Sequence, residues 1–404
     1  MTKKKKSGLK NIIQGKWWYE QHSAKSSENI LLFLADFCQK LPSTIQKPFI
    51  NSIDKTGLLF SKILNIFSIT SYQTFLIKGK EKKSGHSLSI LFRGNIESIQ
   101  FLLEYFIKDT DVVKIEKNIK LNVSKSKNEH DLELIQSDSF FTGYFQRKGY
   151  LVFPENISMR LKVSQSLDTI ISQVSSSIVE DLKKAEKMRY VVEITDDYEK
   201  FLIFYEQMYK PYATWKHKSK KRIATFASIK HLWLQGAKIL LIKKGKEYIF
   251  GGIFLKENKK IITHYAGLST GKFHHLQHGI MAFSYSALIN IAKKMKCDRI
   301  DFGTAKPFFQ DGLLKYKAKW RMNITQTPSY LSDVFGLKIN KKSESVKNIF
   351  LNNPFIFYHD QSLAVAIIEE KDKKNVEKNE GKTQQRIVKD LPSKFFTIDE
   401  LYRK

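Results

Sequence analysis

Three side chains of this 404-residue sequence have the chemistry of proton transfer: His264, Tyr265 and Asp301. An imidazole titrates near neutral pH and can act as a general base, and a phenol can protonate a leaving group. A carboxylate can orient an ammonium group or accept its proton. These three residues are therefore candidates for general acid–base catalysis.

A cluster of histidines, His274, His275 and His278, raises the question of a metal site. On a helix, residues 274 and 278 would share one face, as zinc ligands often do. No cysteine or carboxylate lies nearby in the sequence to complete a ligand set. We therefore expect no metal.

Lysines alternate with aromatic or small residues near position 317, in the order Lys315, Tyr316, Lys317, Ala318, Lys319, Trp320. As a strand, the segment would present all three lysines on one face and could bind phosphates. As a helix, it would align residues 315 and 319 and turn residue 317 away. A solvated basic turn is the plain alternative.

The charge balance of the chain is strongly basic. Lys and Arg number 69 and Asp and Glu 40, which gives a net charge of +29. Such an excess indicates phosphate-bearing partners, namely nucleic acid, anionic lipid or a phosphorylated cofactor, unless it is only a lysine-rich surface. Two distant cysteines, Cys38 and Cys297, exclude a disulfide framework. With no secretory signal or membrane-spanning run, we expect a cytoplasmic protein that is not secreted.

The first 78 residues read as a basic, helical and amphipathic extension. Residues 58–69 are apolar except for a thin stripe formed by Lys62, Asn65 and Ser68, so most of that helix needs a cover. The extension either docks on the following domain or makes peripheral contact with a membrane surface.

Residues 79–165 form the next expected unit, with strands around one helix. We expect strands at 87–92, 112–115, 119–123, 150–153 and 159–163 and a helix near 97–107. The polar residues 122–133 read as a surface loop.

Residues 166–340 carry the most regular pattern. A strand at 190–194 precedes a helix that we expect to be capped by Thr195 and ended by Pro211. A second helix at 223–235 leads to three strands joined by short turns, at 239–242, 248–255 and 260–266. A crossover helix, with apolar residues Ile280, Phe283, Ala287 and Ile291, returns the chain to a strand at 299–303.

This order of elements resembles that of GNAT-type N-acyltransferases. Local sequences resemble the FemAB-like or BioF-like acetyltransferase group of that superfamily: residues 181–187, residues 204–212, Gly251-Gly252, residues 264–267, residues 301–303 and residues 312–320. The resemblance covers some 150 residues and implies a mixed α/β sheet flanked by helices. Because FemAB-like proteins commonly carry two such units, residues 79–165 resemble a reduced first copy.

The resemblance also implies a site. In this fold the two central parallel strands splay, so the ends at 264–267 and 300–303 would bind the acyl donor next to His264, Tyr265 and Asp301. We expect further side chains to bind the substrate: Tyr209, Tyr212, His217, Lys315, Lys317 and Trp320.

The donor is less defined. GNAT enzymes bind coenzyme A through an Arg or Gln followed at fixed spacing by two small residues, and here only Gly279 fits. Lys272 and the start of the crossover helix could still hold a phosphate. The resemblance therefore implies no tightly bound cofactor but an activated donor, which is acyl-CoA, an acyl carrier protein or aminoacyl-tRNA.

Residues 341–404 are expected to be a C-terminal segment with a charged linker at 369–390 and a last apolar cluster, which is a docking motif or a packed turn. Taken together, the sequence predicts a transferase that moves an acyl or aminoacyl group to an amine of an amino acid, amino sugar or cell-envelope precursor. The alternative is a non-catalytic scaffold of the same fold that binds nucleic acid or an anionic membrane.

Overall fold

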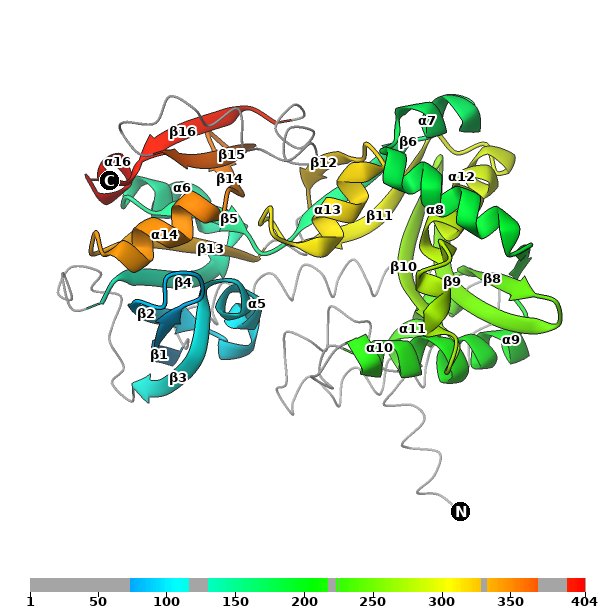
Figure 1. Cartoon of the computed structure of the whole chain (residues 1–404), viewed down its shortest axis with the longest axis horizontal. Coiled ribbons are helices and arrows are strands. Elements are labelled where there is room, and N and C mark those ends of the chain that lie inside the picture. The colour runs from blue at the N-terminus through cyan, green and yellow to red at the C-terminus, as the bar shows by residue number, and fades with distance from the viewer. Residues whose placement is uncertain are drawn as a thin grey trace, which may run out of the picture. The chain divides into compact units, whose positions relative to one another are not determined.

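The computed structural model describes residues 73–115, 130–216, 223–224, 226–327, 333–369 and 391–403. These residues form two compact units (Figure 1). Unit 1 contains residues 160–303 and 320–322, and unit 2 contains the described residues of 63–159, 304–319 and 323–404. The expected domains followed chain order, whereas unit 2 takes residues from both sides of unit 1.

Unit 1 is built on a mixed sheet. Its strands neighbour each other in the order β6 (Ile157–Lys162), β11 (Arg299–Ala305), β10 (Lys260–Leu268), β9 (Glu247–Glu257), β8 (Lys238–Lys244) and β7 (Val191–Thr195). Strands β7 to β10 pair antiparallel, and β10 pairs with β11 in parallel. The expected meander, crossover helix and returning strand are confirmed, because short polar turns permit only antiparallel neighbours and the long helix permits a parallel one.

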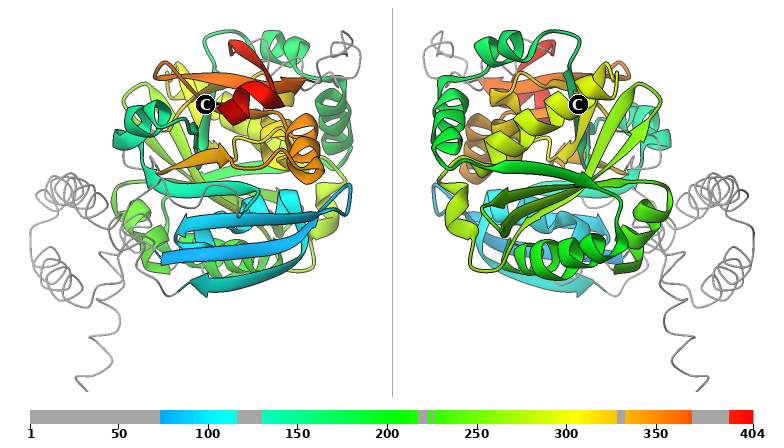
Figure 2. Two further views of the ribbon diagram at one scale, coloured as in Figure 1. Left: turned by 90° about the vertical axis from the view of Figure 1, so that its left-hand side faces the viewer. Right: turned by 90° about the vertical axis from the view of Figure 1, so that its right-hand side faces the viewer.

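Helices cover both faces of this sheet. They are α7 (Leu167–Gln173), α8 (Ser176–Lys187), α9 (Tyr198–Ile203), the π-helix η3 (Phe204–Tyr209), α10 (Lys210–Lys216), α11 (Phe226–Leu234), the short 3-10 helix η5 (Phe273–Leu276) and α12 (Ile280–Lys294). Figures 1 and 2 show α7, α8 and α12 over one face and α9 to α11 over the other. Two covered faces explain why four consecutive apolar residues of β8, 239–242, are all buried.

The start of α9 differs from the expectation. The carboxylate of Asp197, not Thr195, caps the helix by accepting a hydrogen bond from the Lys200 N–H at 2.9 Å. Thr195 is the last residue of β7, and its hydroxyl accepts from the Asp197 N–H at 3.1 Å. A carboxylate at this position satisfies a free N–H and also favours the positive end of the helix dipole.

Pro211 does not end the helix, contrary to expectation. The chain runs from η3 directly into α10, with Pro211 in its first turn. A proline cannot donate to the carbonyl four residues before it, here that of Gln207. The Thr270 N–H donates to that carbonyl instead, at 3.3 Å, so the π-helix accommodates the proline without leaving this oxygen unpaired.

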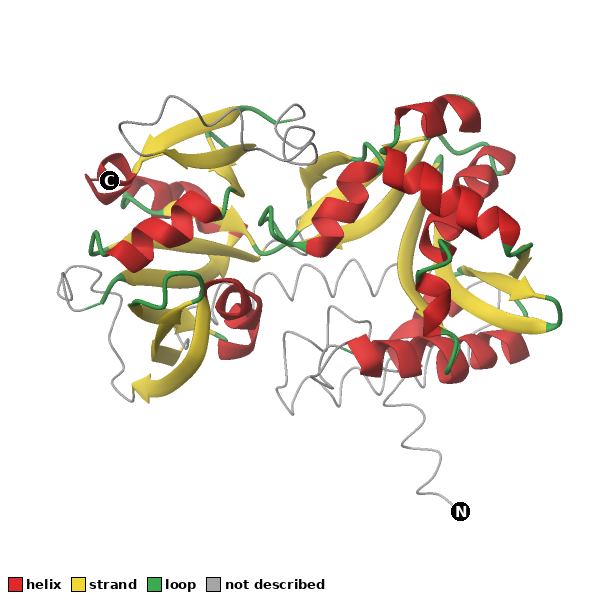
Figure 3. Ribbon diagram, viewed as in Figure 1, coloured by secondary structure: helices red, strands yellow, loops and turns green. Residues whose placement is uncertain are grey.

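Unit 2 contains two sheets. Figure 3 shows its strands in yellow and its helices in red. The larger has the order β3 (Ile107–Ile115), β1 (Gln73–Glu81), β2 (Ser87–Gly94), β4 (Leu132–Asp138), β13 (Asp333–Ile339) and β5 (Leu151–Pro154). The smaller has the order β14 (Phe355–His359), β15 (Ser362–Glu369) and β16 (Ser393–Thr397). Unit 2 also contains α5 (Ile96–Phe106), η2 (Ser139–Phe141), α6 (Thr142–Arg147), α13 (Gly312–Lys319), β12 (Asn323–Gln326), α14 (Glu344–Asn352) and α16 (Ile398–Arg403).

One apolar core joins the early and late parts of unit 2. It contains Phe92 of β2, Phe101 of α5, Phe335 of β13 and Phe355 of β14. The last apolar cluster of the chain packs on the same core through Phe396 and Ile398, so it is a packed end and not a separate tail.

Several expectations concern the ends and loops of the chain. The helical extension was expected to reach residue 78, but residues 73–78 belong to β1, which pairs with β2 and β3. Residues 1–72, the expected strand at 119–123 and residues 370–390 of the charged linker lie outside the described residues. The expected loop at 122–133 ends earlier, because β4 begins at Leu132.

Within the described part of the chain, no helix is both long and apolar enough to cross a membrane.

Candidate active site

The parallel pairing of β10 with β11 is short. Register partners exist at three positions only: Lys260 with Arg299, Ile261 with Ile300 and Ile262 with Asp301. Both strands continue, to Leu268 and Ala305, without further partners between them. The strands therefore separate where the candidate residues begin, as the resemblance implied.

The separation coincides with an irregularity on the other edge of β10. The β9 register passes from Thr263 to Tyr265 and omits His264, which forms a bulge. Bulges redirect side chains and are common beside active sites. His264 is exposed and Tyr265 is half-buried. A main-chain irregularity and an exposed imidazole thus meet at the point where the parallel strands part.

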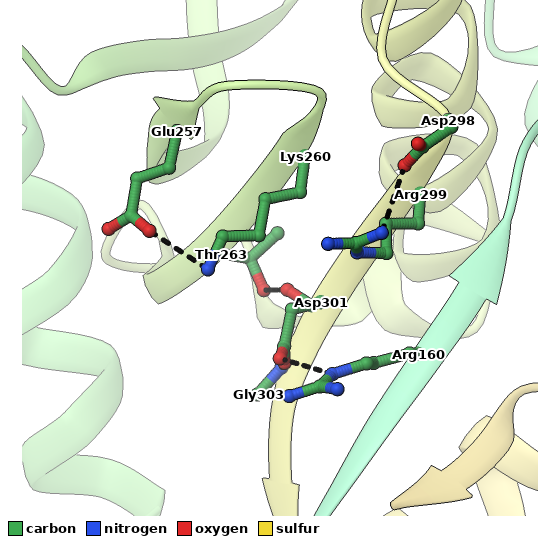
Figure 4. A network of polar contacts seen from close by, with 8 residues as sticks. All are labelled: Arg160, Glu257, Lys260, Thr263, Asp298, Arg299, Asp301 and Gly303. Carbon is green, nitrogen blue, oxygen red and sulfur yellow. Dashed lines mark hydrogen bonds and ion pairs between the residues drawn. The ribbon is translucent and has the colours of Figure 1, made fainter. Parts of the chain in front are cut away.

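The Asp301 carboxylate is held at both oxygens (Figure 4). Arg160 Nε of β6 donates to Oδ2 at 3.0 Å, and the Gly303 N–H donates to Oδ1 at 2.9 Å. The Thr263 hydroxyl donates to the Asp301 carbonyl oxygen at 3.2 Å and links the two separating strands. Donors already engage both carboxylate oxygens, so this geometry suits an orienting role better than proton acceptance.

Sequence reasoning missed Arg160. It lies in an expected strand, but the chain separates it from Asp301 by 141 positions, and only the sheet order brings β6 next to β11. Polar and apolar residues alternate in 157–162, so nothing in that segment marked residue 160 as a partner of Asp301.

Tyr265 packs against a fixed partner. Its ring lies edge-on to that of Tyr209, with the centroids 5.2 Å apart. The Tyr209 hydroxyl accepts a hydrogen bond from the Ala224 N–H at 2.8 Å, and Tyr209 is buried. The π-helix that carries Tyr209 packs directly on β10. It lies so close that a Cβ atom at Gly267 would come within 2.4 Å of the Met208 carbonyl oxygen. Tyr209 therefore positions Tyr265 and does not itself offer a surface to a substrate.

Tyr212 belongs to a second aromatic group. Its ring lies 5.8 Å from Phe273 and 5.7 Å from Trp215, which is 57% exposed. Burial raises the pKa of the Tyr212 phenol, so this hydroxyl stays protonated at neutral pH. His217 lies outside the described residues.

The lysine segment is the helix α13, so the strand arrangement with three aligned lysines is wrong. Lys315 is exposed, whereas Lys317 is buried and its Nζ donates to the Thr304 carbonyl oxygen at 2.9 Å. A buried ammonium that donates to the backbone stabilises unit 2 and is not arranged to bind a phosphate.

Trp320 is also a core residue. It is fully buried, with its ring 5.6 Å from that of Tyr285, which stacks on Phe302 at 4.3 Å. Adjacent residues in a strand point to opposite faces, so Trp320 lies on the face of β11 away from the Asp301 side chain. The expected contact of Trp320 with a substrate does not fit this position.

The two candidate phosphate-binding residues have other partners. Lys272 forms an ion pair with Glu247 at 2.7 Å. Gly279 precedes α12 with φ +75°, and a Cβ atom there would lie 1.9 Å from the Asp181 carbonyl oxygen of α8. Glycine is required here because α8 packs closely on the start of α12.

The histidine cluster has a structural explanation. His275 is buried, and its Nδ1 lies 2.6 Å from the Tyr190 hydroxyl. Burial, with help from His274 and Lys244, lowers the pKa of His275 to about 4, so the ring is neutral at pH 7. Among the residues that the structure describes, no group of three His, Cys, Asp or Glu side chains could hold a metal ion.

Comparisons with known proteins give fold-level similarity only. No protein-family model matches the chain, and no curated protein sequence does. Solved structures similar to this chain include the C-terminal domain of a putative lysylphosphatidylglycerol synthetase from Agrobacterium fabrum, with 11% identity, TM-score 0.35, and coverage of 70% of this chain and 88% of that chain. FemX is 13% identical, with TM-score 0.35 and coverage of 64% and 83%. L-PGS from Bacillus licheniformis is 12% identical, with TM-score 0.34 and coverage of 70% and 88%.

Proposed function

We propose that unit 1 is an N-acyltransferase, which moves an acyl or aminoacyl group from an activated carrier to an amine. One observation carries this proposal: the β10 and β11 pairing stops at Ile262 and Asp301, beside the bulge at His264. Past that point the two strands share no register pairs, and each continues with its own main-chain N–H and C=O groups, to Leu268 and to Ala305. Such groups can bind a carbonyl and stabilise the oxyanion that forms on it.

The side chains around this point supply the remaining chemistry. The amine nitrogen attacks the acyl carbon, a C–N bond forms, and the bond from that carbon to the carrier oxygen or sulfur breaks. His264 removes the proton that the nitrogen loses, and Tyr265 donates a proton to the leaving atom. Asp301, fixed by Arg160 and the Gly303 N–H, orients the acceptor as an ammonium, which loses one proton to the solvent before it attacks. The proton that His264 removes is the second one, which the nitrogen loses as the C–N bond forms.

The geometry near α12 bears on the carrier. Two groups would hold the pyrophosphate of coenzyme A, and both have other contacts. Helix α8 packs closely on Gly279, and Lys272 forms an ion pair with Glu247. This supports a donor that is recognised elsewhere on the protein, either aminoacyl-tRNA or an acyl carrier protein. The acceptor in this proposal is the amine of an amino acid, an amino sugar or a cell-envelope precursor, as FemAB-like membership would imply.

The test is a transfer assay with the full chain. Acetyl-CoA, an acylated carrier protein and aminoacyl-tRNA are each incubated with a panel of amines, and new amide is measured by mass spectrometry. We expect one donor to be consumed and His264→Ala to lower turnover by about 10²-fold or more, as loss of a general base does. His278→Ala, which removes an exposed histidine outside the strands, is the matched control. Absence of amide with every donor, or equal turnover in both variants, contradicts the proposal.

One observation favours a second candidate, the non-catalytic scaffold. Arg160 and the Gly303 N–H already occupy both Asp301 oxygens, as in a purely structural ion pair. If no donor is consumed, salt-dependent binding of the full chain to RNA or to anionic liposomes would support this scaffold.

A further inference from the structure

Strand β7 is an apolar edge of the unit 1 sheet. It pairs with β8 on one side and ends the strand order on the other. Its β-branched residues are exposed: Val191 at 58%, Ile194 at 39% and Val192 at 36%. Because Val191 and Val192 point to opposite faces, the strand is open on both faces as well as along its edge. Unpaired apolar edge strands readily pair with another chain.

Proteins usually protect such edges with charged residues, and β3 shows this protection. β3 ends the larger sheet of unit 2 and carries four charged residues: Lys108, Asp109, Asp111 and Lys114. β7 carries one, Glu193. That carboxylate is already paired with Lys200 at 2.5 Å and with Lys243. Its pKa lies below the usual range because of these two hydrogen bonds, so the charge is matched within unit 1.

The charges that flank β7 favour one kind of partner. Exposed Arg189 precedes the strand, and exposed Asp196 and Asp197 follow it, with Asp196 3.6 Å from Lys238 Nζ and Asp197 capping α9. In an antiparallel pair of identical strands, the basic start of each lies beside the acidic end of the other. The apolar residues then meet at the centre. Such pairing is self-complementary, as a twofold interface requires.

We propose that β7 is an interface for a second copy of this chain, which adds its own β7 antiparallel and joins two unit 1 sheets across a twofold axis. Each copy gains main-chain hydrogen bonds along the free edge and covers the exposed valines and isoleucine of the other. This interface does not depend on the proposed transfer reaction.

The experiment measures oligomeric state with the full chain. Sedimentation velocity over a range of concentrations is expected to show a reversible monomer–dimer equilibrium. The double variant Val192→Lys and Ile194→Lys places two cations on one face of the edge at exposed positions. It should raise the dimer Kd at least about tenfold, which is about 1.4 kcal/mol. Val112→Lys, at an exposed valine of the protected edge strand β3, is the matched control and should leave the Kd unchanged.

Hydrogen exchange of the unmodified chain locates the interface independently of any variant. Amides of residues 191–195 should exchange more slowly at dimeric than at monomeric concentrations. The proposal is overturned if the chain stays monomeric throughout. It is also overturned if the dimer persists in a folded double variant, or if protection appears elsewhere and not in β7.

Discussion

At the scale of the residue, a substitution at Asp301 allows its effect on turnover to be measured apart from its effect on stability. Asp301→Ala removes the ion pair with Arg160 and the hydrogen bond from the Gly303 N–H, at a side chain that is 15% exposed, so the free energy of unfolding should fall by about 1 to 3 kcal/mol while the protein stays folded. Turnover should be abolished, because the carboxylate lies where the parallel strands part. Turnover and urea unfolding measure the two effects. Asp298→Ala, which removes an exposed pair with Arg299, should change neither. Equal turnover of Asp301→Ala and unmodified protein would exclude the orienting role.

Asp333 is the residue with the clearest expected pH dependence. Its carboxyl group accepts from Gln136 Nε2 at 3.2 Å, and the nearby Glu155 pairs with Lys306 at 3.0 Å. Burial, and then the charge of Glu155, raise its pKa from the ordinary 3.8 to about 7. The folded chain therefore binds this proton more tightly than the unfolded chain does, and stability falls as pH rises from about 4 to about 7.

Asp333→Asn keeps an acceptor for Gln136 and removes the charge. We expect the variant to be more stable than the unmodified protein at pH 8, and the difference to shrink toward pH 4. Urea unfolding at several pH values measures this difference. Asp168→Asn, at an exposed carboxylate, should give no such trend. A variant that loses stability at pH 8 would show that the Asp333 charge is well accommodated.

At the scale of the element, the packing of α8 on α12 depends on one glycine. Gly279→Ala would place Cβ 1.9 Å from the Asp181 carbonyl oxygen, so one of the two helices must move. Gly271→Ala is a matched control, because its φ of +74° is close to the +75° of Gly279 but nothing lies within 4 Å of the added Cβ. We expect a cost of about 1 to 2 kcal/mol at Gly271 from backbone strain alone. At Gly279 we expect about 1 to 3 kcal/mol more from overpacking. Thermal and urea unfolding measure the loss of stability in each variant. Equal losses in the two variants would mean that α8 moves away from Gly279 without a measurable loss of stability.

At the scale of the whole molecule, the end of the chain completes the core of unit 2. Strand β16 pairs in parallel with β15, and Phe396 lies 5.8 Å from Phe357. Phe396→Ala should lower the free energy of unfolding by about 1 to 3 kcal/mol, because a half-buried ring is lost from the core. Phe395→Ala, at a neighbouring ring that is 56% exposed, should cost less than about 0.5 kcal/mol. Similar losses in both variants, measured by urea unfolding, would contradict a packed C-terminal end.

The sequence by itself determined the local elements of unit 1. Short polar turns between apolar runs define the meander of β8 to β10, and the periodic apolar residues of 280–291 define α12. These signals depend on residues near each other in the chain, so they can be read without the fold. The same pattern together with the family resemblance placed His264, Tyr265 and Asp301 near the ends of two strands; in the structure they lie where the pairing of β10 with β11 ends, and both strands continue beyond them.

Only the tertiary structure decided what surrounds those residues. Arg160 reaches Asp301 because β6 neighbours β11, and Trp320 is buried beside Tyr285. Residues 333–369 and 391–403 complete a sheet and a core begun at residue 73. Strand order, burial and long-range pairing depend on contacts between elements that lie far apart in the sequence. A local sequence pattern contains no information about those contacts. The sequence could therefore name candidate side chains, while the contacts that hold them follow from the packed chain.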